Sequence, residues 1–488
     1  MSTRSGTNSG PELLLSLERT SGVPLRAQLE NGLRAAVRSG RLAPHSRLPP
    51  TRALASDLGV SRRLVVDAYS QLLAEGYLLA RRGAGTFVAE ATRGAAATAS
   101  EPAPSWPAFD FFPGHPDLAS FPRRQWLRAL REVLREAPDR ALGYPDPRGA
   151  IELRRALAGH VSRVRGVVAD PEAIVVCGGA AQAFALVAGA LAGRRMAVED
   201  PGLPVHRTIL ATHGAELIAL AVDGQGARVG DLAALAAGGP IGSVLVTPAH
   251  QSPTGVALSP ARRAELLAWA QASGGLVIED DYDAEFRYDR APLGALQGLS
   301  PDRVVYTGTV SKTLAPALRI GWLVLPSSLR DAVVERKLLS DHGSATIDQL
   351  ALARLLEGGD YDRHLRAARR RYRARRDALV AALARHVPGA RVTGVAAGLH
   401  AIVRLPRPLD GLALARAAAR RSLGVYPLGY GYMDLRPVDD GLVLGYANLA
   451  EPAIEEGIRR LALALEEVDL DPPVPPNRPA KDGGAIAR

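Results

Sequence analysis

Lysine is rare in this chain, and one of the few lysines has neighbours suited to a reactive amine. Only three of the 60 lysine and arginine residues are lysines, namely Lys312, Lys337 and Lys481. A chain that carries its positive charge on arginine needs lysine where chemistry demands a primary amine that can lose its proton, as in a Schiff base with a carbonyl cofactor. Lys312 lies in the run TGTVSKTLAPALRIGW, where Thr309 and Ser311 add hydroxyls. Arg319 adds a guanidinium that can clamp a phosphate, so the run predicts a cofactor site rather than a surface loop.

Two other segments carry the remaining groups that pyridoxal 5'-phosphate would need. That cofactor requires an acid at its pyridine nitrogen, a polar group near its ring oxygen and donors for its phosphate. In VIEDDYDAEFRY we assign Asp280 to the nitrogen and Tyr282 to the ring oxygen, although a strand-end acid also serves as a helix cap. In VVCGGAAQAF a helix begins after a strand, so the backbone N–H groups of Gly179, Ala180 and Ala181 are predicted to cradle the phosphate.

Two turns are further candidates for cofactor contacts. The Pro-Thr-Gly turn in TPAHQSPTGVAL would hold His250, Gln251 or Ser252 toward the cofactor, although a surface loop can carry the same turn. Tyr144, in LGYPDPRG, is predicted to reach the phosphate of a neighbouring subunit.

Length and composition limit the class of protein. The chain has 488 residues, 47% of them hydrophobic, and a formal net charge of +10, which indicates a globular protein with several domains and a polyanionic partner. Its single cysteine, Cys177, excludes an intrachain disulfide, and we predict no metal site. No apolar run approaches the roughly 20 residues that span a bilayer, and the first residues lack the apolar core of a signal peptide. We expect a cytoplasmic protein.

The N-terminal segment has the pattern of a DNA-reading module. Residues 25–38 place leucines and a valine on one helical face, which predicts a first helix. A second helix is predicted to begin with Thr51 as its N-cap, and a third to begin with Ser61 as its N-cap. A two-stranded wing follows, with its turn at RRGAG.

Basic and small residues stand where such a module would contact duplex DNA. The alternative is a basic domain that binds another protein. The residues predicted to contact DNA are Arg52, Arg62, Arg63, Arg82 and Gly83. The family resemblance given below implies that Ser61 contacts DNA as well.

The rest of the chain predicts an α/β fold. Short apolar strands alternate with alanine-rich helical segments, which is typical of a mostly parallel sheet with helices on both faces. The aminotransferase resemblance given below implies, in addition, a smaller C-terminal α+β subdomain. The expected parts are a disordered start (1–12), a winged helix-turn-helix domain (13–91), a linker (92–108), a cofactor-binding domain (109–468) and a flexible tail (469–488).

These motifs resemble known families. The run LPPTRALASDLGVSRRLVVDAYSQLLAEGYL resembles the winged helix-turn-helix domain of the GntR superfamily, and residues 109–468 resemble fold-type I aminotransferases. In this order they resemble MocR-type transcriptional regulators. The resemblance implies that Lys312 carries the cofactor as an internal aldimine, that Asp280 and Tyr282 contact its ring, and that Arg319 clamps its phosphate. It also implies a domain-swapped, head-to-tail homodimer and an effector carboxylate on Arg207.

Two positions depart from the aminotransferase pattern. Leu203 stands where the family has an aromatic residue that stacks on the pyridine ring, with His206 as a candidate substitute, and Val443 stands where it has the arginine that binds the substrate carboxylate. We therefore expect a regulator of operator DNA that responds to pyridoxal 5'-phosphate or to an amino effector, with vitamin B6 or amino-compound metabolism as candidate targets. The alternative is a working aminotransferase with an attached DNA-binding head.

Overall fold

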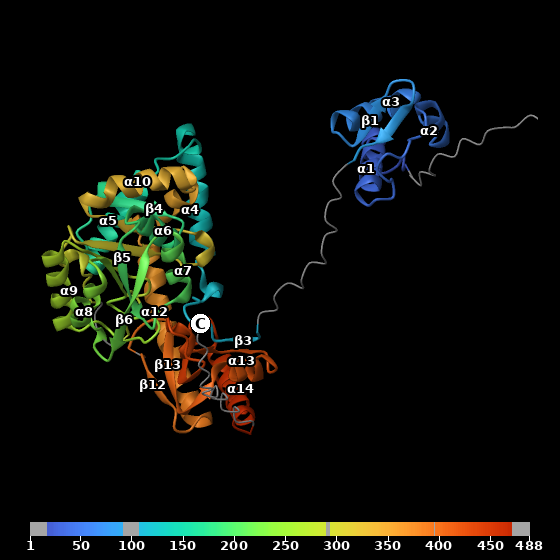
Figure 1. Cartoon of the computed structure of the whole chain (residues 1–488). Coiled ribbons are helices and arrows are strands. Elements are labelled where there is room, and N and C mark those ends of the chain that lie inside the picture. Colours follow the sequence, from blue (N-terminus) through green and yellow to red (C-terminus); the bar gives the residue numbers. More distant parts are fainter. Residues whose placement is uncertain (1–16, 91–106, 289–292, 395, 471–488) are drawn as a thin grey trace, which may run out of the picture. The chain divides into compact units, whose positions relative to one another are not determined.

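The chain forms two compact units, Met1–Ser105 and Trp106–Arg488, which we describe separately (Figure 1). The computed structural model describes residues 17–90, 107–288, 293–394 and 396–470, with side chains up to 468. The predicted disordered start (1–12) lies outside these residues, as do nearly all of the predicted linker (92–108) and tail (469–488). None of the helices in the described ranges is long and apolar enough to cross a membrane.

The N-terminal unit is a three-helix domain with a two-stranded wing. Its core joins Leu29 and Leu33 of the first helix to Val65 and Leu72 of the third, all buried. The first helix has the predicted bounds. The elements are α1 (Leu25–Arg38), α2 (Thr51–Asp57), α3 (Arg62–Ala74), β1 (Leu78–Arg81) and β2 (Gly85–Val88).

One predicted cap is confirmed and one is wrong. The Ser61 hydroxyl oxygen accepts a hydrogen bond from the Leu64 backbone N–H at 3.2 Å, as an N-cap does. At α2 the N-cap is Pro50, not Thr51. Pro50 has the non-helical, extended backbone of a cap position, with φ of −55° and ψ of 143°, so Thr51 becomes the first helical residue.

The C-terminal unit is built on an eight-stranded sheet of order β4-β11-β10-β9-β8-β5-β6-β7. The strands from β10 through β6 are parallel, whereas β11 is antiparallel to both neighbours and β7 is antiparallel to β6. The predicted mostly parallel sheet is confirmed. The strands are β4 (Ile174–Cys177), β5 (Arg195–Asp200), β6 (Glu216–Asp223), β7 (Gly226–Ala227), β8 (Ile241–Val246), β9 (Leu276–Asp280), β10 (Val304–Thr309) and β11 (Gly321–Val324).

Helices cover both faces of this sheet. In β9, Ile278 packs in a cluster with Phe184 of α6, while the adjacent Val277 packs in a different cluster with Leu266 of α9. Since alternate side chains of a strand point to opposite faces, the sheet is buried on both sides. The helices of this layer are α4 (Arg123–Glu136), α5 (Ile151–Arg165), α6 (Ala180–Ala190), α7 (Pro204–Thr212), α8 (Leu232–Leu235), α9 (Pro260–Ser273), α10 (Ser327–Asp341) and α11 (Thr346–Glu357).

A smaller α+β subdomain follows, as predicted (orange to red in Figure 1). Its antiparallel sheet has the order β12-β13-β16-β15, and a short parallel pair, β3 and β14, ties the start of the unit to it. The elements are α12 (Asp360–His386), α13 (Gly411–Ala419), α14 (Glu451–Leu470), β3 (Phe109–Asp110), β12 (Arg391–Thr393), β13 (His400–Asp410), β14 (Leu423–Gly424), β15 (Tyr426–Pro427) and β16 (Val438–Gly445).

Candidate functional site

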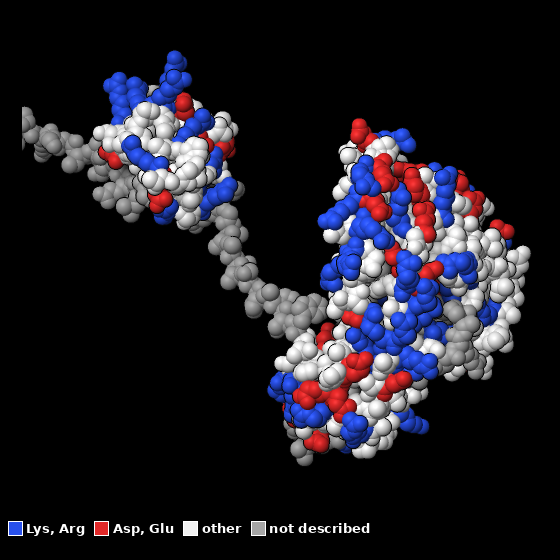
Figure 2. All heavy atoms as spheres, turned by 180° about the vertical axis from the view of Figure 1, so that it is seen from behind, with Lys and Arg blue, Asp and Glu red and all other residues white. Residues whose placement is uncertain are grey.

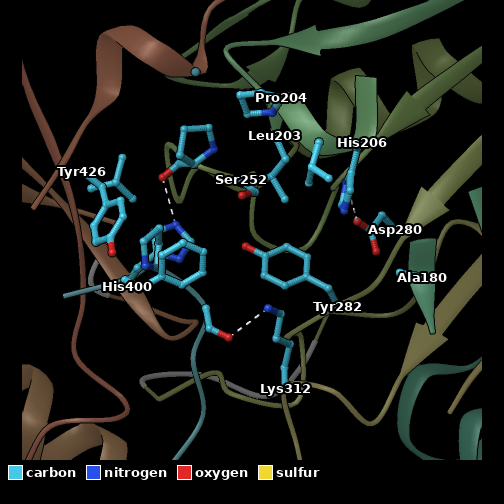
Figure 3. A pocket seen from close by; sticks show the side chains of 18 of the residues that line it. Ala180, Leu203, Pro204, His206, Ser252, Asp280, Tyr282, Lys312, His400 and Tyr426 are labelled. Carbon is cyan, nitrogen blue, oxygen red and sulfur yellow. Dashed lines mark hydrogen bonds and ion pairs between the residues drawn. The ribbon is translucent and has the colours of Figure 1, made fainter. Parts of the chain in front are cut away.

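A cavity of about 550 Å³ lies where the main sheet meets the small subdomain. The carboxyl ends of β9 and β10, the start of α6 and the start of α7 form one side of it, and β15 and β16 contribute to the other. Open α/β sheets bind ligands beyond the carboxyl ends of their strands, so this position suits a ligand site. Lys312, Asp280, Tyr282 and Ser252 all face the cavity (Figure 3).

Lys312 lies on the loop shortly after β10 and lines the cavity with its amine. Its Nζ donates a hydrogen bond to the Gly114 carbonyl oxygen at 2.9 Å. Burial lowers the pKa of Lys312, although the Asp283 and Asp280 carboxylates act in the opposite direction. A lowered pKa increases the fraction of neutral amine, which is the form that attacks a carbonyl carbon. Gly114 has φ of +84°, and a Cβ there would lie 2.9 Å from Lys312 Nζ, so a glycine is required for this approach.

Asp280 ends β9 as a buried carboxyl group with an open oxygen. Its Oδ1 has no hydrogen-bond partner among the described residues, and His206 Nδ1 lies 4.0 Å from Oδ2. Burial raises the pKa of Asp280 to about 8, with Asp281 and Asp283 adding to the effect and Lys312 opposing it. A buried acid with an unpaired oxygen needs a donor or a cation. The protonated nitrogen of a pyridine ring would supply both.

Tyr282 belongs to a hydrogen-bonded group beside Lys312. Its hydroxyl lies 3.1 Å from His250 Nδ1, and the nearby Ser252 side chain acts to lower the pKa of Tyr282, against the larger effect of burial. His250 Nδ1 lies 2.9 Å from Asp283 Oδ2. Burial lowers the pKa of His250, but the Asp283 carboxylate outweighs it and the net pKa is raised. This pair fixes the position of the Tyr282 hydroxyl, which suits Tyr282 and Ser252 to contact the ring oxygen of a cofactor.

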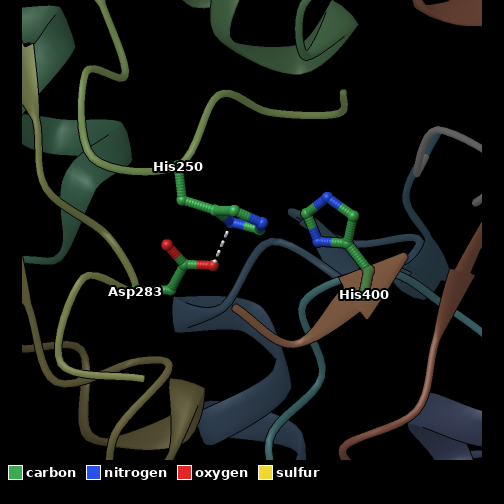
Figure 4. Close-up of side chains that lie close together, drawn as sticks. All are labelled: His250, Asp283 and His400. Atoms are coloured by element: carbon green, nitrogen blue, oxygen red, sulfur yellow. Dashed lines mark hydrogen bonds and ion pairs between the residues drawn. The ribbon is translucent and has the colours of Figure 1, made fainter. Parts of the chain in front are cut away.

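His400 completes a buried cluster with His250 and Asp283 (Figure 4). One ligand atom from each of the three lies within 4.8 Å of the others. His400 Nε2 bonds to the Pro253 carbonyl oxygen at 3.0 Å, and burial lowers the pKa of His400 to about 4. Since His250 already pairs with Asp283, the arrangement is that of a hydrogen-bonded group supporting Tyr282.

The groups predicted to hold a phosphate converge at the start of α6. Ala180 and Ala181 form its first turn and line the cavity, and Gly179, with φ of +87°, is its N-cap. A Cβ on Gly179 would lie 3.1 Å from Arg319 Nη1, so the guanidinium lies against this turn. The hydroxyls of Thr309 and Ser311 are 2.9 Å apart on the adjacent loop, and both residues line the cavity. Backbone N–H groups, two hydroxyls and a guanidinium form a suitable phosphate site.

Leu203 and His206 lie on the side of the cavity formed by the start of α7. Both residues line it. Burial, with a smaller contribution from Lys312, lowers the pKa of His206 to about 4, so its imidazole is neutral at neutral pH. A leucine side chain and a flat neutral ring therefore occupy the region where an aromatic residue was expected.

Five predicted residues do not line the cavity. Gly179 and His250 lie behind it as described above, and the other three are Gln251, Arg207 and Tyr144. Gln251 Nε2 donates to the Pro201 carbonyl oxygen at 2.9 Å, and its Oε1 accepts from the Thr254 N–H at 2.9 Å, so its side chain holds the turn together. Arg207 Nη1 lies 3.2 Å from Asp200 Oδ1 and donates to the Gly431 carbonyl oxygen at 2.9 Å. Tyr144 is 94% exposed.

Sequence reasoning missed several cavity residues that come from distant segments. Phe112 and Gly114 belong to the segment after β3, His400 begins β13, and Tyr426 and Tyr430 precede β16. Among these residues, only Gly114 has a local sequence feature, the Pro-Gly pair, that could have indicated a turn at the cavity. The others carry no motif.

The residues predicted to contact DNA lie at the surface of the N-terminal unit. Ser61 and Arg62 start α3, and Gly83, with φ of +77°, turns the wing between β1 and β2. The side chains of Arg52, Arg62, Arg63 and Arg82 are exposed and form no ion pair within the described part of the unit. Figure 2 shows more basic than acidic side chains on the visible face of this unit. Free guanidinium groups at a helix start and a wing suit DNA phosphates.

Two family models match the chain in this order. Residues 25–88 match "Bacterial regulatory proteins, gntR family", and residues 114–461 match "Aminotransferase class I and II". Solved structures similar to the chain include the multiple substrate aminotransferase from Thermococcus profundus, with 28% identity, a TM-score of 0.69 and coverage of 74% of this chain and 92% of that one. LysN, an alpha-aminoadipate aminotransferase from Thermus thermophilus, has 27% identity and a TM-score of 0.69, covering 74% and 93%.

Curated regulators match over nearly the whole length. The probable rhizopine catabolism regulatory protein MocR of Rhizobium meliloti is 33% identical and covers 95% of this chain and 98% of its own. The pyridoxine biosynthesis transcriptional regulator PdxR of Corynebacterium glutamicum is also 33% identical and covers 91% and 96%. The chain therefore belongs to the MocR-type transcriptional regulators, which join a GntR-type DNA-binding domain to an aminotransferase-like domain whose cofactor is pyridoxal 5'-phosphate.

Proposed function

We propose that this protein binds operator DNA in a manner that depends on what occupies the cavity at Lys312, either pyridoxal 5'-phosphate alone or the cofactor with an amino compound. The observation that carries the proposal is the convergence of Lys312, the unpaired Asp280 carboxyl and the first turn of α6, at Ala180 and Ala181, on one cavity, in a chain with a DNA-binding domain. The ligand need only favour one arrangement of the two units, and a differential affinity of a few kcal/mol is sufficient.

Each residue of the site has a defined role in this proposal. When bound, pyridoxal 5'-phosphate supplies an electrophilic carbon that primary amines attack. Lys312 provides the protein's own amine, and Asp280 holds a proton at the pyridine nitrogen. Tyr282 and Ser252 donate toward the ring oxygen. The phosphate is bound by the α6 N-terminus together with Thr309, Ser311 and Arg319.

Val443 favours a regulator over an enzyme. It lies in β16 at the position of the aminotransferase arginine that binds the substrate carboxylate, and it is 5% exposed. Loss of one partner from a buried charge pair costs roughly 2–5 kcal/mol, which is tens to thousands-fold in affinity. Arg207, our candidate for binding an effector carboxylate, is paired with Asp200. It would have to break this ion pair before it could bind the effector. Efficient turnover of ordinary amino acids is therefore not expected.

We further propose a head-to-tail homodimer acting in the cytoplasm. Tyr144 supports it, because a tyrosine that is 94% exposed beside other exposed apolar groups, including Leu142 at 70%, fits a contact between subunits. In the dimer Tyr144 would reach the phosphate of the partner's cofactor. Arg52, Ser61, Arg62, Arg63, Arg82 and Gly83 would contact the operator.

The test is a titration of operator DNA with purified protein, followed by fluorescence anisotropy at a fixed salt concentration. We expect the operator affinity of the wild type to change when pyridoxal 5'-phosphate or an effector amine is added, and that of Lys312→Ala to stay constant. An operator affinity that no such ligand changes would exclude the proposal. The name of PdxR makes promoters of vitamin B6 genes the first DNA to test, with those of amino-compound metabolism next.

The alternative, a working aminotransferase with a DNA-binding head, predicts a different result. Steady conversion of amino donors to keto acids, at a kcat near the ~10 per second typical of enzymes, would favour catalysis over sensing. The same preparation serves both measurements.

A further inference from the structure

The end of the cavity away from the phosphate site is apolar, and we call it the outer end. Its residues come from the small subdomain and from the segments after β3 and at the start of α7: Phe112, Val205, Tyr426, Leu428, Tyr430 and Val443. Val443 pairs with Tyr426 across β16 and β15, and it packs with Ile402 and Leu428 in a small buried cluster. Phe112 meets Tyr426 edge to face, with ring centroids 5.0 Å apart. The outer end is therefore an apolar and aromatic wall that is buried at Val443 and Leu428 and partly exposed elsewhere.

Positive charge is confined to the opposite end. Among the described residues that line the cavity, the only lysine and arginine are Lys312 and Arg319, and both belong to the cofactor side. The two lining histidines, His206 and His400, have pKa values lowered to about 4, chiefly by burial, so they are neutral near pH 7. Arg207 lies outside the lining and is paired with Asp200.

This distribution discriminates between two kinds of amino compound. A ligand with a carboxylate would bury that charge against Val443 and Leu428 without a cation or a sufficient set of donors, which is strongly unfavourable. A ligand with an uncharged apolar tail would remove that tail from water and contact aromatic rings, which is favourable. The absence of a cation in the outer end therefore distinguishes the two kinds of ligand.

We propose that the effector is a primary amine with an apolar or aromatic tail and no carboxylate, bound with its nitrogen toward Lys312 and its tail in the outer end. This inference rests on the function proposed above. The ligand amine takes the place of the Lys312 amine on the cofactor carbon, so one C=N bond forms as another breaks. Two protons pass from the ligand nitrogen to the Lys312 nitrogen, and neither water nor an oxidant is consumed.

Matched pairs of ligands test the inference directly. The holoprotein is titrated with 2-phenylethylamine and L-phenylalanine, and with 3-methylbutylamine and L-leucine, while the visible absorbance of the bound cofactor is followed. Members of each pair differ only in the α-carboxylate. We expect each amine to bind at least about tenfold more tightly than its amino acid. Equal or tighter binding of the amino acids would overturn the inference.

Substitution of Val443 reverses the expectation. Val443→Arg places a guanidinium in the outer end, so L-phenylalanine should bind at least about tenfold more tightly than it does to the wild type, and 2-phenylethylamine more weakly. Val443→Ile, the matched control, should keep the wild-type preference. An unchanged visible band confirms that each variant still folds and holds the cofactor. A folded Val443→Arg variant with the wild-type preference would count against the inference.

Operator binding, measured on the same samples, separates this inference from the proposed function. If the amines bind by absorbance but operator affinity does not respond to any ligand, the pocket assignment stands and the regulatory proposal fails. If pyridoxal 5'-phosphate alone changes operator affinity and no amine binds, the regulatory proposal stands and this inference is wrong.

Discussion

The two ends of the cavity are built in opposite ways. The cofactor end presents charged and hydrogen-bonding groups, among them Asp280, Lys312 and Arg319, on strand ends and a helix start of the main sheet. The outer end presents apolar side chains such as Phe112 and Val443, most of them from the small subdomain. Binding of the cofactor and choice of the effector are thus assigned to different parts of the fold. Substitutions at one end should leave the role of the other end intact.

The largest effect is expected at the amine of the cofactor end. Lys312→Ala removes the nitrogen through which, in our proposal, the protein holds the cofactor covalently, so attachment should be lost completely. Absorbance spectroscopy should show no visible band, and mass spectrometry after borohydride reduction should find no phosphopyridoxyl group. Lys481→Ala, the matched lysine control from the predicted tail, should keep both signals. Full retention of the band in Lys312→Ala would contradict the assignment of that end.

The stability of the protein at low pH tests whether the histidines of the cavity lining are neutral. His400 is one of the two histidines in that lining. A histidine whose pKa falls on folding binds fewer protons in the native state than in the unfolded state. It therefore does not reduce the free energy of unfolding near pH 7, but it reduces that free energy progressively as pH falls from 6.5 toward 4. For a pKa lowered to about 4, the loss reaches roughly 3 kcal/mol at pH 4. His400→Gln should therefore gain about that much relative to the wild type between pH 7 and pH 4, measured by urea unfolding.

The free energy of unfolding must be compared between variant and wild type, because other buried groups change it with pH in the opposite direction. Four carboxyl groups have pKa values raised mainly by burial, so they favour the folded state as pH falls. They are Glu199, Glu279 and Glu285, with pKa values of about 7, and Asp280, with a pKa of about 8. A pH-independent difference would mean that His400 is not held neutral.

The next effect concerns the acid at the pyridine nitrogen. Asp280→Asn removes the charge that, in our proposal, pairs with the protonated ring nitrogen, and hydrogen bonds to charged groups contribute roughly 1.5–3 kcal/mol. The affinity for pyridoxal 5'-phosphate should fall about 10- to 100-fold in an absorbance titration. Asp302→Asn, at an exposed turn, is the control and should bind normally. An unchanged affinity in Asp280→Asn would remove Asp280 from the cofactor end.

The smallest effect should appear at the outer end. Phe112→Leu keeps an apolar side chain and removes an aromatic contact worth roughly 0.5–1.5 kcal/mol. We expect 2-phenylethylamine to bind about 3- to 10-fold more weakly and pyridoxal 5'-phosphate to bind within about twofold of the wild type. Parallel absorbance titrations measure both. Equal losses for the two ligands would mean that the ends are not independent.

The cofactor end was predictable because each of its parts is a short continuous motif. Gly179 to Ala181 join a strand to a helix, Asp280 and Tyr282 end a strand, and the loop from Thr309 to Arg319 contains the lysine. Local geometry places such groups at the same sheet edge. Gln251 shows the limit of this reasoning, because the turn is as expected but its side chain bonds back into the turn. The neighbouring Ser252 faces the cavity instead.

The sequence by itself determined the order of the two domains, the helix and strand pattern, and the motifs that we propose hold the cofactor, because periodicity, caps and strand ends act over a few residues. Only the tertiary structure decided the outer end. Val443 was indicated by the aminotransferase pattern, but its neighbours were not. Phe112 and Tyr426 are far apart in the chain and carry no motif, and they meet because the small subdomain folds against the start of the unit and the strand ends of the main sheet. Burial in the folded protein also determined the charge of the two histidines in the cavity lining. The same fold that collects these side chains removes water from His206 and His400 and so keeps them neutral.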